Sequence, residues 1–204
     1  VDGVIVENYG WGYEDSNLAF DFCFRVIKNL TEIVVKNSKI PVGINILPND
    51  YIKAFMVADE VGCKFIQMDH IVGQFHNCKS VNSGKFLEAR NIFSNVAVLG
   101  GIHPKYYRLI NKNQQIDISA LEAKELADAI VVTGEYMVGE ADIQDLKTVK
   151  LVIGDKPLII GSGLNADNAT VQLKIADGAI VGTAFKRSGV WKGEPIDTDL
   201  VKSL

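Results

Sequence analysis

The stretch that decides the fold is LIIGSGLNADNATVQLKIADGAIVGTAFK, residues 158–186. It contains two short, continuous apolar runs, Leu158–Gly161 and Ala179–Gly182, and each run ends in glycine. A continuous apolar run of this length is typical of a strand that is buried on both faces, as in a parallel sheet. A small turn, Ala176-Asp177-Gly178, leads from the preceding helical segment into the second run. The stretch therefore predicts a strand, a helix and a second, parallel strand.

Runs of the same kind, bounded by Gly, Pro or Asn, precede this stretch. They are Val4–Glu7, Val42–Leu47, Phe65–Asp69, Val96–Gly100 and Ala129–Thr133. Segments with apolar residues at spacings of three and four lie between them and predict helices, namely Phe20–Val35, Asp50–Val61, Ser119–Ala127 and Asp142–Val149. This alternation of strands and helices permits an open doubly wound sheet or a closed eight-stranded barrel.

Two observations favour the barrel. No G-x-G-x-x-G motif follows an early strand, so the dinucleotide fingerprint of a Rossmann sheet is missing. Polar residues stand at the carboxyl end of nearly every run, and a (β/α)-barrel keeps its active site at that face. We therefore predict an α/β fold, a (β/α)8 TIM barrel, as a single domain over residues 1–204. Because the chain starts directly on a strand, we expect the first βα unit to be absent from it.

Composition disfavours several classes of protein. The 204 residues suffice for one sizeable core, and the net charge of −4 disfavours a partner held by many phosphates along a nucleic acid. The three cysteines form neither a C-x-x-C pair nor a Cys/His zinc spacing, which predicts a reducing, cytoplasmic location. No apolar run approaches the roughly 20 residues needed to cross a bilayer. We therefore predict no membrane span.

The glycine-rich ends of the last two strands form the sharpest candidate site. Glycines let the backbone approach an anion, and successive N–H groups before a helix form a concave donor site. In barrel enzymes this position frequently binds phosphate. The alternative is that the glycines only make tight turns. The predicted phosphate-binding residues are Gly161, Ser162, Gly163, Gly182, Thr183 and Ala184.

Other polar groups follow the earlier strands, and the candidate catalytic residues among them are Glu7, Asn45, Asp69, His103 and Lys105. Glu7 suits a general base, a metal ligand or a hydroxyl-binding group, with an ion pair to Lys105 as the architectural alternative. Asn45 suits substrate contact or a hydrogen bond between barrel layers. His103 suits proton transfer near neutral pH, and Lys105 an electrophile or amine nucleophile. The sequence identifies no cofactor, and a divalent metal on Glu7, Asp69 and the histidines is disfavoured because their spacing matches no local ligand motif.

Five phrases follow one another in an order that resembles the BtpA/SgcQ family, whose name comes from a protein associated with photosystem I biogenesis. They are residues 4–10, 41–50, 131–134, 161–168 and 177–186. The resemblance implies a (β/α)-barrel related to phosphate-binding barrel enzymes, starting one βα unit earlier than this chain. His103 and Lys105 match the family's phrase around the fifth strand, whereas Gly101 and Tyr106 replace an acidic residue and a second histidine.

Two functional hypotheses follow. The first is an enzyme that acts on a small phosphorylated metabolite, such as a sugar phosphate or nucleotide, by acid–base chemistry of the isomerase or aldolase-like lyase kind. A phosphohydrolase is less favoured because no clear metal set appears. The second is a non-catalytic assembly or stabilising factor of the photosystem I biogenesis type, in which the surface does the work. A homo-oligomer, in which a partner chain closes the gap left by the missing strand, is a further hypothesis.

Overall fold

The computed structural model describes residues 1–8, 21–76, 78–105, 107–134, 139–189 and 194–203. Tyr9, Gly10 and Tyr106, which belong to the family-like phrases, lie outside the described residues. The chain separates into two compact units, and each is described by itself. The first unit comprises Val1–Asp69 and Val81–Leu99, and the second comprises His70–Ser80 and Gly100–Leu204.

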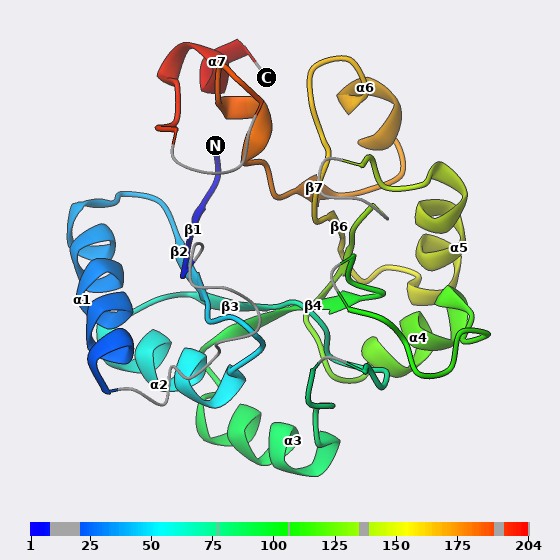
Figure 1. Cartoon of the computed structure of the whole chain (residues 1–204), viewed down its shortest axis with the longest axis horizontal. Helices are drawn as coiled ribbons and strands as arrows, with labels where there is room; N and C mark the ends of the chain where they lie inside the picture. The colour runs from blue at the N-terminus through cyan, green and yellow to red at the C-terminus, as the bar shows by residue number, and fades with distance from the viewer. Residues whose placement is uncertain (9–20, 77, 106, 135–138, 190–193, 204) are drawn as a thin grey trace. The chain divides into compact units, whose positions relative to one another are not determined.

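The first unit consists of parallel strands joined by helices (Figure 1). Its elements are β1 (Val4–Glu7), α1 (Asp21–Asn37), β2 (Val42–Asn45), α2 (Tyr51–Val61), β3 (Phe65–Met68) and α3 (Ser83–Ile92). Helix α1 packs on β1 and β2, and α2 packs on β2, β3 and both neighbouring helices. The parallel register places Val4 opposite Val42 and Glu7 opposite Asn45. Each helix is thus the crossover between consecutive parallel strands.

Aromatic side chains fill the core of the first unit. Phe55 and Phe86 are both fully buried, with ring centroids 5.9 Å apart, and Phe93 stacks on Phe55 at 5.6 Å. The ring of Phe65 lies so close to β2 that a Cβ on Gly43 would meet it at 2.1 Å. Only glycine therefore fits at position 43, because any side chain would overlap the ring.

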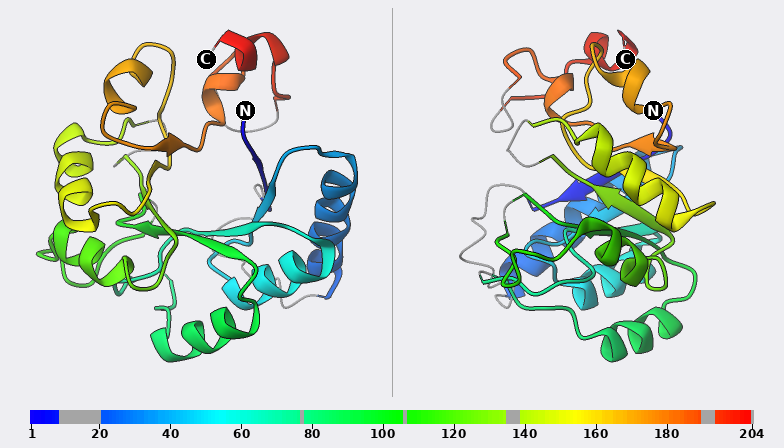
Figure 2. Two further views of the ribbon diagram at one scale, coloured as in Figure 1. Left: turned by 180° about the vertical axis from the view of Figure 1, so that it is seen from behind. Right: turned by 90° about the vertical axis from the view of Figure 1, so that its right-hand side faces the viewer.

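The second unit repeats the alternation. Its elements are α4 (Ile116–Ala123), β5 (Ala129–Val132), α5 (Ile143–Ile153), β6 (Leu158–Ile160), α6 (Ala169–Gln172), β7 (Gly178–Ala179), the 3₁₀ turn η1 (Thr183–Phe185) and α7 (Thr198–Ser203). Helix α4 packs against α5, and α5 packs on β6 (Figure 2). Fully buried Ile130, Leu146, Leu158 and Ile160 form the core between these elements.

Strand β4 (Ala97–Ile102) begins in the first unit and ends in the second. The seven strands form one sheet whose order follows the chain, β1 to β7. The pairs β1–β2, β2–β3, β5–β6 and β6–β7 are parallel. A doubly wound sheet reverses its strand order at a switch point, and this sheet does not. The predicted fold of the TIM-barrel type is therefore confirmed.

The helix predicted over Ser119–Ala127 is misplaced, because α4 covers Ile116–Ala123. Leu126 and Ala127 form the turn that follows, and the N–H groups of both donate to the carbonyl of Ala123. Asp50 and Asp142, in contrast, cap α2 and α5 at the predicted starts of those helices. Helix α6 lies where a helix is expected between the last two strands, whereas no sequence pattern predicted α3 or α7.

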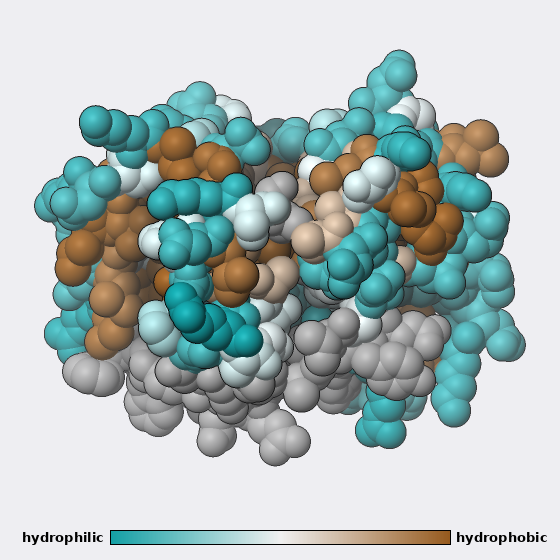
Figure 3. All heavy atoms as spheres, turned by 90° about the horizontal axis from the view of Figure 1, so that it is seen from above, coloured by the Kyte–Doolittle hydropathy of each residue, from teal (hydrophilic) through white to brown (hydrophobic). Residues whose placement is uncertain are grey.

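The outer surface mixes apolar and charged side chains. Several large apolar residues are exposed, including Leu151 at 86% and Ile92 at 75%. Figure 3 shows one face of the molecule, on which groups of hydrophobic residues stand among hydrophilic ones. Apolar atoms contribute more than half of the accessible surface of a typical folded protein. Within the described ranges, every helix is too short or too polar to span a lipid bilayer.

Candidate functional site

One amide joins two carboxylates in the first unit. Asn45, at the end of β2, donates from Nδ2 to Glu7 Oε1 at 2.9 Å and to Asp69 Oδ1 at 3.1 Å. Asn45 is fully buried, whereas the two acidic residues are partly exposed. Three predicted site residues at the ends of three consecutive strands are thus brought together. A carboxylate held in place by such a bond suits proton transfer.

A second asparagine clamps the same strand ends. Asn8 Nδ2 donates to the carbonyl of Leu47 at 3.1 Å, and the N–H of Leu47 donates back to Asn8 Oδ1 at 2.7 Å. This reciprocal pair fixes the chain that follows β1 against the chain that follows β2. The carboxylates are therefore presented by a rigid support. In the described part of the chain, no group of three His, Cys, Asp or Glu residues is arranged to hold a metal ion.

His103 follows β4 in the second unit, with a left-handed backbone (φ 48°) that is uncommon for a residue with a side chain. Its Nε2 lies 2.9 Å from Ser119 Oγ, and Ser119 in turn accepts from Gln114 Nε2 at 2.8 Å. Burial lowers the pKa of His103 because it disfavours the charged imidazolium. His103 is therefore neutral near pH 7. Lys105 lies in the turn just beyond it, partly exposed.

Ser119 and Gln114 were not among the residues predicted from the sequence. Ser119 was placed at the start of a helix, where a serine usually caps the backbone. Its side chain faces His103 instead, 16 positions away along the chain. No local pattern signals such a contact.

His70 is a buried histidine in the second unit. It is fully buried, and its ring lies 4.5 Å from that of Phe75 and 5.4 Å from that of Tyr107. Its Nε2 is 3.2 Å from Cys78 Sγ. Burial lowers the pKa of His70 to about 4. His70 is therefore uncharged at neutral pH and stabilises its surroundings by aromatic packing.

The two predicted phosphate-binding turns follow adjacent strands. Strands β6 and β7 pair in parallel, so Gly161–Gly163 and Gly182–Ala184 lie beyond the same edge. Within the described residues, the backbone N–H groups of Gly163, Gly182, Thr183 and Ala184 donate to no acceptor. Gly182 is exposed, and a Cβ built on it would meet no atom within 4 Å. Open backbone donors at neighbouring strand ends suit an anion.

The two turns differ in why they contain glycine. Gly163 has φ +78°, and a Cβ on it would lie 2.3 Å from the carbonyl oxygen of Gly139. Asn168 Nδ2 donates to the Gly163 carbonyl at 2.9 Å and holds the turn in place. Close packing therefore requires glycine at 163, whereas no such contact requires it at 182.

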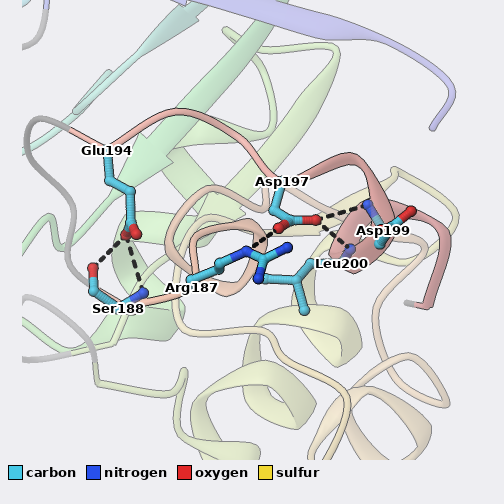
Figure 4. A network of polar contacts seen from close by, with 6 residues as sticks. All are labelled: Arg187, Ser188, Glu194, Asp197, Asp199 and Leu200. Atoms are coloured by element: carbon cyan, nitrogen blue, oxygen red, sulfur yellow. Dashed lines mark hydrogen bonds and ion pairs between the residues drawn. The ribbon is translucent and has the colours of Figure 1, made fainter.

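Polar contacts fix the chain that follows η1 (Figure 4). Arg187 pairs with Asp197, and Glu194 accepts from the backbone N–H of Ser188 at 3.0 Å. Asp197 also accepts from the N–H groups at the start of α7, and these bonds, with Arg187, hold its pKa below the usual range. The N–H of Asp197 donates to the Phe185 carbonyl at 2.7 Å. This network anchors η1, and so positions the donors of Thr183 and Ala184.

Solved structures with a similar fold include phosphoribosyl anthranilate isomerase from Pyrococcus furiosus. That structure matches with a TM-score of 0.60 at 19% identity, over 100% of this chain and 86% of the other. A Schiff-base-forming fructose-1,6-bisphosphate aldolase matches with a TM-score of 0.53 at 14% identity, over 100% and 92%. Identities this low establish the barrel fold alone.

Proteins found by sequence similarity have higher identities to this chain than these solved structures. An uncharacterized protein of Methanocaldococcus jannaschii is 32% identical over 100% of this chain and 78% of its own length. The photosystem I biogenesis protein BtpA of Synechocystis is 30% identical over 93% of this chain and 68% of its own length. The model of the BtpA family matches residues 1–204. The chain therefore belongs to the BtpA family.

Proposed function

We propose that this protein is an enzyme that acts on a small phosphorylated metabolite and binds the phosphate group at the turns Gly161–Gly163 and Gly182–Ala184. The observation that carries the proposal is the set of open backbone N–H donors beyond two adjacent parallel strands. Several N–H groups that converge on one anion bind it without a side-chain cation.

The solved structures with the same fold support the choice of ligand. Their names describe a phosphoribosyl anthranilate isomerase and a fructose-1,6-bisphosphate aldolase, and both names denote phosphorylated sugar compounds. Barrel enzymes frequently bind phosphate after their last two strands. The names of these solved structures favour an isomerase or an aldolase-like lyase.

His103 is the candidate catalytic residue of the second unit in this proposal. It is neutral near pH 7, and three features constrain it: the left-handed backbone, the bond to Ser119 and partial burial. Backbone strain of this kind collects at functional sites, where the surrounding structure enforces it. In the first unit, the candidate acid–base groups are the carboxylates of Glu7 and Asp69, which Asn45 bridges. Lys105 is the candidate cation of the second unit. Replacement of Glu7 by Gln would then lower kcat at least 100-fold, in the range of general acid–base catalysis.

A thermal-shift titration with inorganic phosphate and a panel of sugar phosphates and nucleotides tests the phosphate site. A ligand at about 100 times its Kd stabilises the folded state by about 2.7 kcal/mol. The discriminating variant is Gly182→Asp, because position 182 has room for a side chain and the added carboxylate repels phosphate. Gly163→Asp is unsuitable, since any side chain there collides with Gly139.

The matched control is Ser94→Asp, which adds the same charge in an exposed turn after α3. We expect the wild type and the Ser94→Asp variant to be stabilised by the same compound, and the Gly182→Asp variant not to respond. An equal response of the Gly182→Asp variant would place the phosphate elsewhere and refute the assignment.

The name of the Synechocystis relative favours a second candidate, a non-catalytic factor in photosystem I biogenesis. In that case the barrel has no catalytic role, and the protein functions through its outer surface. This alternative predicts that no phosphorylated compound of the panel shifts the melting temperature of the wild type. It also predicts that Gly182→Asp leaves the biological role intact.

A further inference from the structure

Three side chains form a hydrogen-bonded chain behind the ring of His103. Gln114, two residues before α4, donates from Nε2 to Ser119 Oγ at 2.8 Å. Ser119 Oγ lies 2.9 Å from His103 Nε2. Ser119 is 1% exposed, and its hydroxyl contacts these two partners. The donors and acceptors of these three side chains must therefore be matched to one another.

The direction of these hydrogen bonds follows from a count of donors and acceptors. The Gln114 amide nitrogen can only donate, so Ser119 Oγ accepts from it. The Ser119 hydroxyl then has its own proton to place, and His103 Nε2 is the acceptor that the described residues offer it. A buried hydroxyl proton without an acceptor costs about 1–3 kcal/mol. Nε2 is thus the unprotonated nitrogen, and the ring proton is on Nδ1.

We infer that Ser119 and Gln114 are positioning residues that hold His103 as the neutral tautomer with its proton on Nδ1. Within the described residues, Nδ1 makes no hydrogen bond, and the residue is partly exposed. In the function proposed above, on which this role depends, His103 donates a hydrogen bond to a substrate oxygen that gains negative charge. It does not accept the proton that leaves carbon.

Nitrogen-15 NMR of histidine-labelled protein without ligand tests the tautomer directly. The chain has three histidines, and a His103→Asn variant identifies the His103 signals by their loss. At pH 8.5, well above the lowered pKa of His103, the neutral ring gives separate protonated and unprotonated nitrogen shifts. We expect Nδ1 to show the shift of a protonated nitrogen and Nε2 that of an unprotonated one.

The Gln114→Glu variant should reverse the direction of these hydrogen bonds without a large change in the shape of the side chain. A carboxylate cannot donate, so it accepts the Ser119 proton, and Ser119 Oγ must then accept from His103 Nε2. We expect the ring proton to move from Nδ1 to Nε2 in this variant. Ser119→Ala removes the link, and both tautomers should appear. Gln114 is only partly buried, so the Gln114→Glu variant should fold even if Ser119→Ala does not.

Two results would overturn the inference: a wild-type ring protonated on Nε2, or a tautomer that stays the same in the Gln114→Glu variant. Both measurements use the ligand-free protein. Failure of the tautomer assignment is therefore distinct from failure of the phosphate proposal, which the thermal-shift titration tests by itself.

Discussion

Acid should destabilise this protein through His70 by an amount that follows from its burial. The side chain is fully buried among aromatic rings, and its pKa is lowered from 6.5 to about 4. The unfolded chain binds a proton at the ordinary pKa of about 6.5, whereas the folded chain resists it. The stability that His70 contributes is therefore fully present above pH 6.5 and is lost as the pH falls from there through about 4.

The size of this loss follows from the two pKa values. Each pKa unit corresponds to about 1.36 kcal/mol, so the difference between 6.5 and about 4 is worth about 3 kcal/mol. His70→Gln removes the titrating group and keeps a polar side chain beside Cys78. Urea unfolding followed by circular dichroism at pH values from 8 to 4 would measure both proteins.

The wild type should lose about 3 kcal/mol more than the His70→Gln variant over this range. All other groups are the same in both proteins, so their contributions cancel in the difference. A constant offset between the two curves reports only the packing lost in the variant. Curves that stay parallel from pH 8 to pH 4 would refute the reasoning, because they would mean that folding does not resist the protonation of His70.

Three further predictions concern stability and are read from urea unfolding at pH 7. Gly163→Ala should cost about 3 kcal/mol, because it combines a left-handed backbone with a collision against Gly139, whereas Gly182→Ala should change stability by under about 0.5 kcal/mol; equal effects would contradict the different roles of the two glycines. Asn45→Leu should destabilise by about 2 kcal/mol, since two partly buried carboxylates lose their shared donor; a neutral effect would mean that this amide does not bridge them. Asp142→Ala should cost about 1 kcal/mol through loss of the cap on α5, and an unchanged stability would count against the bonds to the N–H groups of that helix.

The strands could be predicted because the apolar pattern of each strand is local in the sequence. A run such as Val4–Glu7 or Ala129–Thr133 is apolar throughout since both faces of its strand are covered, and this needs no knowledge of partners. Helices with a capping residue, such as α2 after Asp50, were placed almost to the residue. Helix α4 was misplaced because its N-cap, Gln115, makes no side-chain cap bond, so nothing in the sequence marked its start.

The candidate site was predictable only as a set of positions. Strand ends gave Glu7, Asn45 and Asp69, and the structure adds that one amide nitrogen joins both carboxylates across separations of 38 and 24 residues. The combined action of these residues and His103 in one reaction stays a prediction.

By itself, the sequence determined the alternation of buried strands and helices and the places where polar groups follow strands. Both depend on the apolar pattern within a few residues. Tertiary structure alone decided that Ser119 meets His103, and that glycine is required at 163 but not at 182. Such contacts join segments far apart in the chain, and their geometry depends on how the whole backbone packs, which no short stretch of sequence records.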